Sequence, residues 1–433
     1  MPRRVWIGVF LCCLGTINYM DRIALSIAAK PIAQQFGLSS VWMGYLFSSF
    51  IWSYTLFQLP MGFLVDRIGA KRMAAYGIFI WSLATAMTGA GWNFTSILVT
   101  RLVMGGGEST TNPVIGKVVR EWIPTSERGV FASLSGSGSF VGPALASALF
   151  GASIGLIGWR WSFVMAGGIG MMWLLAWLYW FGDPESVRWL SAEEREKILN
   201  ERQEKKGKRA GASGGEGHKF SQLLSSKTLW GLALTMGCNV YAQYLFLTWL
   251  PSYLIATRHL TILKTGLFTA VPYAIAAVLC IFLGKISDIY IKKEGVTGGR
   301  RRNVVALALM LGAVVLIVPV VHSIWVLVGV FAISLSGIAT TTTLDFSLLN
   351  DLLVDPRNIG KAMAFVVIGG NVFGMMAPII TGYIIQITGS YNWAFLIAGL
   401  LLVSGATIVL TMTRRPITPK SAGIPTAPQP QHV

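Results

Sequence analysis

The chain has 433 residues, of which 54% are hydrophobic and only 12% are charged, about half the charged share of a soluble domain. This composition excludes an ordinary water-soluble globular protein. A formal net charge of +17 would suggest nucleic-acid binding in a soluble protein, but here the basic residues lie between long apolar runs, and we expect no nucleic-acid partner.

The apolar runs predict membrane-spanning helices, because each is near the roughly 20 residues that one crossing requires. They are continuous rather than alternating, which favours helices over a β-barrel. The predicted spans lie near residues 5–29, 41–65, 73–91, 94–119, 128–151, 161–182, 228–255, 265–290, 303–320, 325–350, 359–386 and 391–412. The predicted fold class is an all-α membrane protein with twelve transmembrane helices in two pseudo-symmetric halves of six.

A charged stretch separates the two halves. We predict a six-helix half at residues 1–182, a cytoplasmic linker with a short helix at 183–227, a second six-helix half at 228–415 and a disordered tail at 416–433. Within the linker, Ser191-Ala-Glu-Glu194 has the pattern of a capping box and predicts the start of the short helix.

The distribution of basic residues predicts the orientation in the membrane. An even number of spans places both termini on one side. With the termini inside, the outer loops hold only Lys30, Arg160, Arg258 and Lys264. We therefore expect a multi-pass protein of the bacterial inner membrane, surrounded by lipid, with both termini in the cytoplasm. The four cysteines lie in predicted spans without metal-ligand spacing, and we expect no metal site.

The first span contains the polar stretch Asn18-Tyr19-Met20-Asp21-Arg22. An acid and a base inside a membrane helix each cost on the order of 3 kcal/mol unless they face a protein interior or a water-filled cavity. Neighbouring helical residues point about 100° apart, so at least one of these charges needs a partner on another span. Arg101 and Glu108 in the fourth span are the candidates. They are two helical turns apart, roughly 10 Å along one face, and could line one cavity.

These four charges suggest a transport chemistry. Arg22 and Arg101 stay cationic at any working pH, and a guanidinium grips a carboxylate with two hydrogen bonds. Protonation of Asp21 or Glu108 would free an arginine for an anionic substrate, which is a physical route to proton:anion symport. The alternative is an ion pair that only locks two helices together.

Several motifs carry a family resemblance. Gly62-x3-Asp66-Arg67-x-Gly69-x-Lys71-Arg72, with a weaker echo at Gly284–Asp288, resembles the signature loop of the major facilitator superfamily. Further segments resemble its anion:cation symporter family of sugar-acid and other organic-anion transporters. They are Asn18–Arg22, Arg101-x6-Glu108, Trp122-Ile-Pro124-x-x-Glu127-Arg128-Gly129, Pro184-x4-Trp189-Leu190-Ser191-x2-Glu194 and Gly389-Ser390-Tyr391-Asn392-Trp393.

The resemblance implies that Arg22 and Arg101 bind the substrate carboxylate, while Asp21 and Glu108 couple protons. It also implies that Tyr19 and Tyr54 line the cavity, although each could be a packed aromatic residue. Asn371 resembles a polar position of the family and could bind a hydroxyl group or bridge helices. Gln243, with Tyr241 and Tyr244, is a weaker candidate for substrate binding.

Two further groups of residues have other expected roles. Asp66, Arg67, Arg72 and Asp288 lie at cytoplasmic span ends, and we expect them to act in conformational gating rather than binding. Asp345 follows the polar patch Thr340–Thr343 in the tenth span. It could contact a polar substrate, pair with an arginine or simply lie near a helix end.

The function predicted from the sequence is proton-driven import of a small organic carboxylate by alternating access, by a monomer without cofactor other than the coupling proton. Sugar acids, short hydroxy or dicarboxylic acids and aromatic acids all remain open as substrates, and sodium remains open as the coupling ion in place of protons. Gly138-x3-Gly142-Pro143 partly matches a motif of drug:proton antiporters, so drug efflux is an alternative. A transporter-like solute sensor signalling through 183–227 is a third hypothesis. No nucleophile–base set or phosphate loop is visible, and we expect no enzyme.

Overall fold

The computed structural model describes residues 4–124, 127–185, 187, 189–196, 198–200, 223–292, 299–355 and 358–417. Most of the predicted tail and much of the predicted linker lie outside these residues, so the predicted domain boundaries stay predictions. Within the described part of the chain, extended structure is limited to one isolated bridge between Leu353 and Ile417. All longer elements there are helices, as predicted.

The first half contains six membrane-length segments. Their helices are α1 (Val5–Ile27), α2 (Ala29–Phe36), α3 (Ser40–Ile68), α4 (Ala70–Thr88), α5 (Phe94–Glu108), α6 (Thr111–Trp122) and α7 (Arg128–Trp180). The short α2 extends the first segment, and α5 with α6 forms the fourth. Helix α7 contains the fifth and sixth, because Gly158 has a non-helical backbone with φ 78° and breaks it.

The second half repeats this arrangement. Its helices are α10 (Lys227–Arg258), α11 (Ile262–Lys292), α12 (Arg300–Gly312), the 3-10 helix η2 (Ala313–Val320), α13 (Ile324–Leu352), α14 (Ile359–Thr388) and α15 (Asn392–Met412). Helix α12 and η2 together form one segment. Counted in this way, the described residues contain twelve membrane-length segments, which agrees with the predicted fold class.

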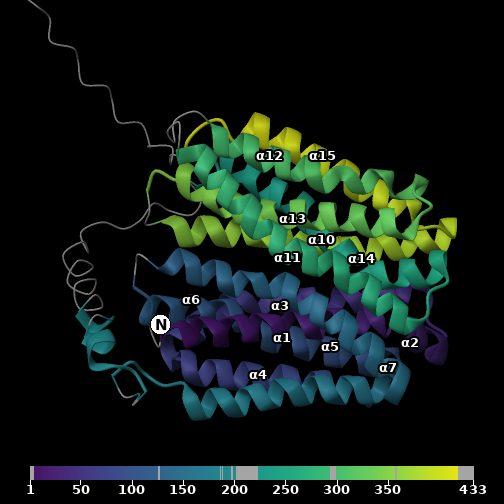
Figure 1. Cartoon of the computed structure of the whole chain (residues 1–433), viewed down its shortest axis with the longest axis horizontal. Helices are drawn as coiled ribbons and strands as arrows, with labels where there is room; N and C mark the ends of the chain where they lie inside the picture. Colours follow the sequence, from purple (N-terminus) through teal and green to yellow (C-terminus); the bar gives the residue numbers. More distant parts are fainter. Residues whose placement is uncertain are drawn as a thin grey trace, which may run out of the picture.

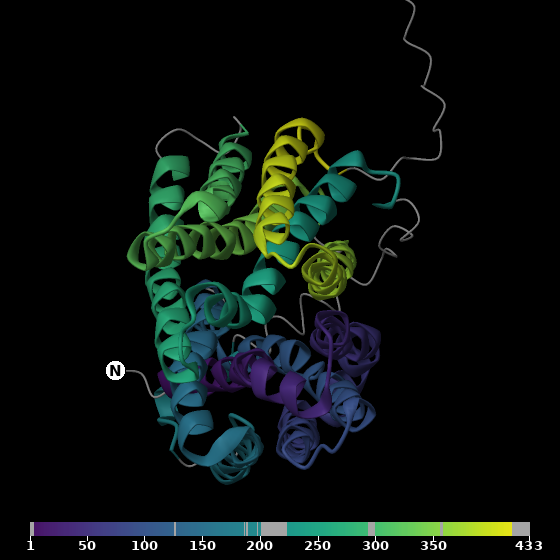
Figure 2. The ribbon, with the colours of Figure 1, turned by 90° about the vertical axis from the view of Figure 1, so that its right-hand side faces the viewer.

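The two halves lie side by side as separate groups of helices. The purple-to-blue helices form one group and the green-to-yellow helices the other, in both views (Figure 1, Figure 2). Contacts between the groups run mainly through α7 with α11, α3 with α14 and α1 with α10. Seven stretches of the described residues are long and apolar enough to cross a membrane by themselves, and one of them, Gly136–Trp180, covers two segments.

Local sequence signals explain where several helices begin and end. The Ser39 hydroxyl accepts a hydrogen bond from the backbone N–H of Trp42 at the start of α3. Asn93 and Ser96 form a reciprocal capping box at the start of α5. Helix α14 ends at Gly389, whose left-handed backbone (φ 66°) favours glycine. These caps satisfy the unpaired backbone groups at helix termini.

One end of the bundle, which we call the basic end, holds Arg4, Arg120 and Arg301. The Arg4 guanidinium donates two hydrogen bonds to the Glu127 carboxylate, at 2.9 and 2.8 Å, and one to Glu194 at 3.3 Å. Glu194 in turn receives the predicted capping contact, because its backbone N–H donates to the Ser191 hydroxyl at 3.3 Å. The start of α1 is thereby tied to the segment before α7 and to the short linker helix.

At the opposite end the two halves are in close contact. The Ser48 hydroxyl donates to the carbonyl of Met375 at 2.7 Å, and the hydroxyls of Tyr45 and Tyr383 lie 3.4 Å apart. A Cβ atom at Gly44 would lie 2.6 Å from the carbonyl oxygen of Pro378, so this approach needs glycine. Within the described residues, side-chain hydrogen bonds and ring contacts between the halves lie in the middle of the bundle or toward this end.

Candidate functional site

The centre of the bundle contains a buried ion pair between α1 and α5. The Arg22 Nε donates to Glu108 Oε2 at 2.9 Å, and the two side chains are 5% and 0% exposed. The second carboxylate oxygen of Glu108 accepts no hydrogen bond from a described residue. The partner that the sequence required for Arg22 is therefore Glu108, supplied by another span as expected.

Arg101 and Asp21 are equally buried but do not form an ion pair with any described residue. An Nη of Arg101 donates to the backbone carbonyl of Asp21 at 3.4 Å and lies 3.0 Å from the sulfur of Met104. Within the described part of the chain, the Arg101 Nε and the Asp21 Oδ2 have no hydrogen-bond partner. Both side chains are 2% exposed. Arg101 is thus a buried guanidinium without a carboxylate, and such a group is costly unless a ligand supplies one.

Aromatic rings surround the two guanidiniums. The Arg22 guanidinium carbon lies 4.5 Å from the ring centres of Tyr19 and Phe50 and 4.9 Å from that of Tyr54. Phe50 also lies 5.5 Å from the guanidinium of Arg101. The structure therefore brings both predicted tyrosines to the cluster and adds Phe50. The signal for Phe50 was its position one helical turn before Tyr54, on the same face of α3.

The second half contributes polar groups rather than charges to this cluster. From α10, the Tyr244 hydroxyl accepts a hydrogen bond from an Arg22 Nη at 3.4 Å. The neighbouring Gln243 is half-buried, and no described hydrogen bond joins it to the cluster. On α14, the Asn371 amide donates to the Gln58 side chain at 3.5 Å and so bridges the halves. Substrate-binding roles for Gln243 and Asn371 stay predictions.

Asp345 lies on α13, apart from this cluster. Its side chain is 0% exposed, and neither carboxylate oxygen has a hydrogen-bond partner among the described residues. An arginine partner was one of the roles considered for it from the sequence, and none is present in the described part of the chain.

The signature loop lies at the basic end. Asp66 Oδ1 is 3.3 Å from a guanidinium nitrogen of Arg120 and 3.9 Å from the Lys117 Nζ. The same Lys117 Nζ donates to the backbone carbonyl of Val65 at 2.8 Å, where a cation complements the helix dipole at the end of α3. The side chains of Arg67 and Arg72 are exposed, and the side chain of Asp288 lies outside the described residues. The gating roles stay predictions.

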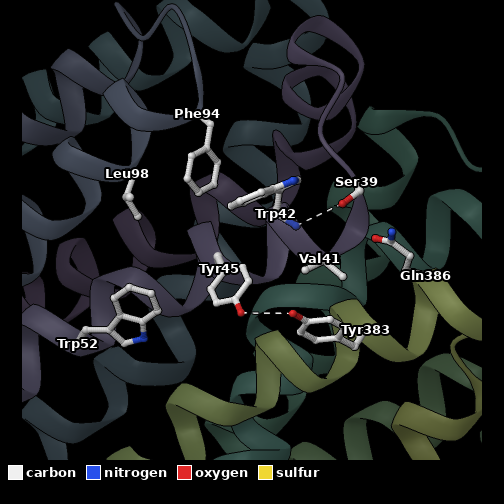
Figure 3. A pocket seen from close by; sticks show the side chains of 9 residues that line it. All are labelled: Ser39, Val41, Trp42, Tyr45, Trp52, Phe94, Leu98, Tyr383 and Gln386. Carbon is white, nitrogen blue, oxygen red and sulfur yellow. Dashed lines mark hydrogen bonds between the residues drawn. The ribbon is translucent and has the colours of Figure 1, made fainter.

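A pocket lies at the opposite end, between α3, α5 and α14, and its volume is about 480 Å³. Figure 3 shows its lining, which is dominated by aromatic rings and crossed by the contact of Tyr45 with Tyr383. The residues that line it are Ser39, Val41, Trp42, Tyr45, Trp52, Phe94, Leu98, Tyr383 and Gln386. None of the predicted binding or coupling residues lines this pocket, so it is separate from the charged cluster.

Comparison with known proteins supports the same type of molecule. The family model of the Major Facilitator Superfamily matches residues 11–355 and 299–432. The chain is 31% identical to the probable galactarate/D-glucarate transporter GudP of Escherichia coli (strain K12), over 92% of this chain and 90% of that relative. It is also 31% identical to the hexuronate transporter of Bacillus subtilis (strain 168), over 96% of both chains.

A solved structure extends the likeness to three dimensions. The crystal structure of a bacterial homolog to the human lysosomal transporter Spinster superposes with a TM-score of 0.76 at 17% identity. The match covers 96% of this chain and 97% of that chain. At this identity the likeness concerns the fold alone.

Twelve membrane-length segments in two halves of the described residues, together with relatives that are transporters and not enzymes, define a transmembrane transporter. The chain belongs to the Major Facilitator Superfamily, in the branch that contains the sugar-acid transporters named above. The superfamily and branch predicted from the sequence are thereby confirmed.

Proposed function

We propose that this protein imports a sugar acid together with protons by alternating access. The observation that carries the proposal is Arg101, a buried guanidinium that forms no ion pair with a described residue, at the centre of the bundle beside the Arg22–Glu108 pair. A small organic carboxylate is the ligand that such a group fits best, since two parallel N–H···O bonds satisfy both the charge and the geometry.

The surroundings of the arginines suit a hydroxylated carbon chain. Tyr19, Phe50 and Tyr54 offer ring faces, while the hydroxyls of Tyr54 and Tyr244 offer hydrogen-bonding groups. The Tyr54 hydroxyl is fixed by the Asn112 amide, which donates to it at 2.9 Å. A sugar acid has a carboxylate for the guanidinium and hydroxyls for these groups. The names of the relatives, a galactarate/D-glucarate and a hexuronate transporter, support the same class.

Charge balance supports coupling to protons. Asp21, Arg22, Arg101 and Glu108 together carry no net charge when all are ionised. Bringing a carboxylate into this desolvated cluster adds an uncompensated negative charge, which is costly. Protonation of Glu108 would restore neutrality and release Arg22 from its 2.9 Å bond, so that both arginines could face the substrate. Each substrate carboxylate would then enter with about one proton.

We infer that the basic end faces the cytoplasm, since basic residues are concentrated on the inner side of membrane proteins. The contacts of Ser48 with Met375 and of Tyr45 with Tyr383 then close the outer side. Under this proposal the structure represents the inward-facing conformation of a bacterial inner-membrane transporter, with both termini in the cytoplasm. The charged cluster lies within one six-helix half and needs no second copy to complete it, so we propose that the transporter works as a monomer.

The glycine motif behind the efflux alternative has a packing explanation. A Cβ atom at Gly138 would lie 2.7 Å from the backbone nitrogen of Thr16, and one at Gly142 would lie 2.5 Å from the Thr16 carbonyl oxygen. Small residues at this spacing let α7 approach α1 closely, which is a common device in membrane helices. The motif therefore gives no separate support for drug efflux.

The test uses purified full-length protein in proteoliposomes that contain a pH-sensitive dye. Galactarate, D-glucarate, a hexuronate and the corresponding neutral hexose are added outside in turn. We expect internal acidification with one or more of the acids, none with the neutral sugar, and loss of the signal in Arg101→Ala. Acidification that is independent of the carboxylate, or a response only to lipophilic cations, would contradict the proposal.

A further inference from the structure

Asp345 is a buried carboxyl group that the proposed mechanism does not use. Its side chain is 0% exposed, and neither Oδ1 nor Oδ2 has a hydrogen-bond donor among the described residues. It lies seven residues before Leu352 at the end of α13, about 10 Å along the helix from the basic end. A carboxylate that is desolvated and unpaired is among the most costly groups a protein can contain. Something must therefore neutralise Asp345.

Two other buried side chains near Asp345 also present oxygen atoms without a donor. Thr341 is one helical turn before Asp345, on the same face of α13, and its hydroxyl has no hydrogen-bond partner among the described residues. Asn239 of α10 donates from Nδ2 to the Ile338 carbonyl at 3.2 Å and to the Thr342 hydroxyl at 2.9 Å. Both amide hydrogens are thereby used, and the amide oxygen has no partner in the part of the chain that the structure describes.

Among the described residues, no cationic side chain neutralises Asp345. The helices that pack against α13 are α10, α11, α12 and α14, with η2. The ionisable groups with described side chains on these helices are Lys227, Cys238, Tyr241, Tyr244, Tyr253, Arg258, Lys264, Tyr273, Cys280, Lys285, Arg300, Arg301, Arg302, Lys361 and Tyr383. None of them forms a hydrogen bond or ion pair with Asp345. Lys285, at a similar depth on α11, is exposed, and Arg301 pairs with Asp351 at 3.2 Å.

We propose that Asp345 is the anchor of a second cation site, in the second half of the transporter, and that the site takes a proton or a sodium ion. Carboxylate, amide and hydroxyl oxygens are the ligands that hard cations prefer, and a proton needs only the carboxylate. Thr342, which contacts Asn239, is partly exposed, so the buried oxygens lie next to a side chain that is not fully enclosed.

The geometry also connects this site to the charged cluster. Asn239 and Tyr244 are five residues apart on α10, about 7.5 Å along the helix. Tyr244 bonds to Arg22, while Asn239 bonds to the turn of α13 that precedes Asp345. A cation that draws Asn239 and Asp345 together would act on the same helix that holds the Tyr244 hydroxyl against Arg22.

The experiment uses the purified full-length chain without substrate, so its result does not depend on the transported molecule. Infrared spectroscopy detects the C=O stretch of a protonated buried carboxyl, and thermal unfolding is followed in NaCl and in KCl at equal ionic strength. The variants are Asp345→Asn, Asp345→Glu and the control Asp351→Asn, an acid on the same helix that pairs with Arg301.

A protonated-carboxyl band at neutral pH that is lost in Asp345→Asn, shifted in Asp345→Glu and kept in Asp351→Asn would support a proton site. A rise in Tm of roughly 2–5 °C in sodium over potassium, lost in Asp345→Asn, would support a sodium site. If the unsubstituted protein shows neither the band nor a sodium-specific rise, the proposal is wrong. This last outcome needs no variant, so it holds even if Asp345→Asn does not fold.

Discussion

The two halves of the molecule bury an acid in equivalent spans but surround it differently. The fourth segment of the first half contains Glu108 and the fourth of the second half contains Asp345, and both side chains are 0% exposed. Glu108 has Arg22 at 2.9 Å, whereas neither oxygen of Asp345 has a partner among the described residues. Equivalent spans of a repeated fold therefore place their buried acids in different electrostatic surroundings.

This difference assigns different tasks to the two halves. In the first half, two arginines and two acids balance one another, so under the proposed function an anion would enter together with a proton. In the second half, Tyr244 and Asn371 provide uncharged contacts, and the buried acid can accept only a positive charge. Charge recognition of the substrate is thus expected from the first half, while the second half adjusts affinity.

The largest effect is expected for Arg101→Ala. This change removes the buried guanidinium that forms no ion pair in the described part of the chain, and substrate affinity should fall at least about 100-fold, corresponding to about 3 kcal/mol. Binding is measured by the substrate-induced change in Tm or by calorimetry. Arg101→Lys keeps the positive charge but cannot donate two parallel hydrogen bonds to a carboxylate. Its substrate affinity should therefore lie between that of the unsubstituted protein and that of Arg101→Ala. Arg120→Ala, at the exposed basic end, serves as the control. An equal loss of substrate affinity in Arg101→Ala and Arg120→Ala would contradict the assignment of anion recognition to the buried cluster.

Glu108→Gln should abolish proton-driven accumulation of the substrate while leaving substrate exchange across the membrane intact. The amide cannot exchange a proton, so a pH gradient of one unit, which supports about tenfold accumulation in one-proton symport, should support none. Exchange of internal for external substrate should continue, because Arg101 is unchanged. Accumulation and exchange of labelled substrate are measured in the same proteoliposomes, with Glu193→Gln, an exposed acid of the linker helix, as the control. Full accumulation in Glu108→Gln would show that the proton enters elsewhere.

Asp66→Asn tests the signature loop, whose charge contacts with Lys117 and Arg120 lie within the first half. These groups are far from the charged cluster, so substrate affinity should be kept. Loss of these contacts should change the free-energy difference between the two transport conformations by about 1 kcal/mol, which would lower turnover about fivefold. Initial rates at saturating substrate are compared with binding constants from the same preparation. A loss of affinity at normal turnover would contradict the gating role.

The smallest effect is expected for Tyr244→Phe, which removes only the hydroxyl that the second half offers to Arg22 at 3.4 Å. One neutral hydrogen bond is worth about 1 kcal/mol, so KM should rise about fivefold or less with little change in kcat. Gln243→Leu is the neighbouring control, because Gln243 has no described bond to the cluster. A loss as large as that of Arg101→Ala would mean that the second half recognises the anion as well.

Sequence reasoning predicted the features that follow from the cost of burial. Hydropathy indicated the twelve segments, and the expense of Asp21 and Arg22 inside a span required a partner on another helix, which is Glu108. The aromatic residues Tyr19 and Tyr54 also lie against Arg22. These inferences needed only helix periodicity and the energetics of charges in an apolar medium.

Other features depend on how helices rotate and approach one another, which one sequence does not determine. Nothing in the chain indicated that Tyr244 rather than Gln243 would reach Arg22. The sequence also did not predict the close contact of the two halves at the end opposite the basic end, because the contact of Tyr45 with Tyr383 joins residues 338 positions apart. The break expected between residues 151 and 161 is present at Gly158, but the sequence did not show that a single non-helical residue would make it.

The Arg4 contacts have a practical consequence for anyone who purifies this transporter. Because one guanidinium holds both Glu127 and Glu194, the first turn of the chain is a structural element rather than a convenient attachment point. An affinity tag or fluorescent protein fused immediately before it would crowd this three-way junction and could loosen the linker helix from the first half. A fusion placed beyond Ile417, the last described residue, leaves the junction intact and is the better choice for production and labelling.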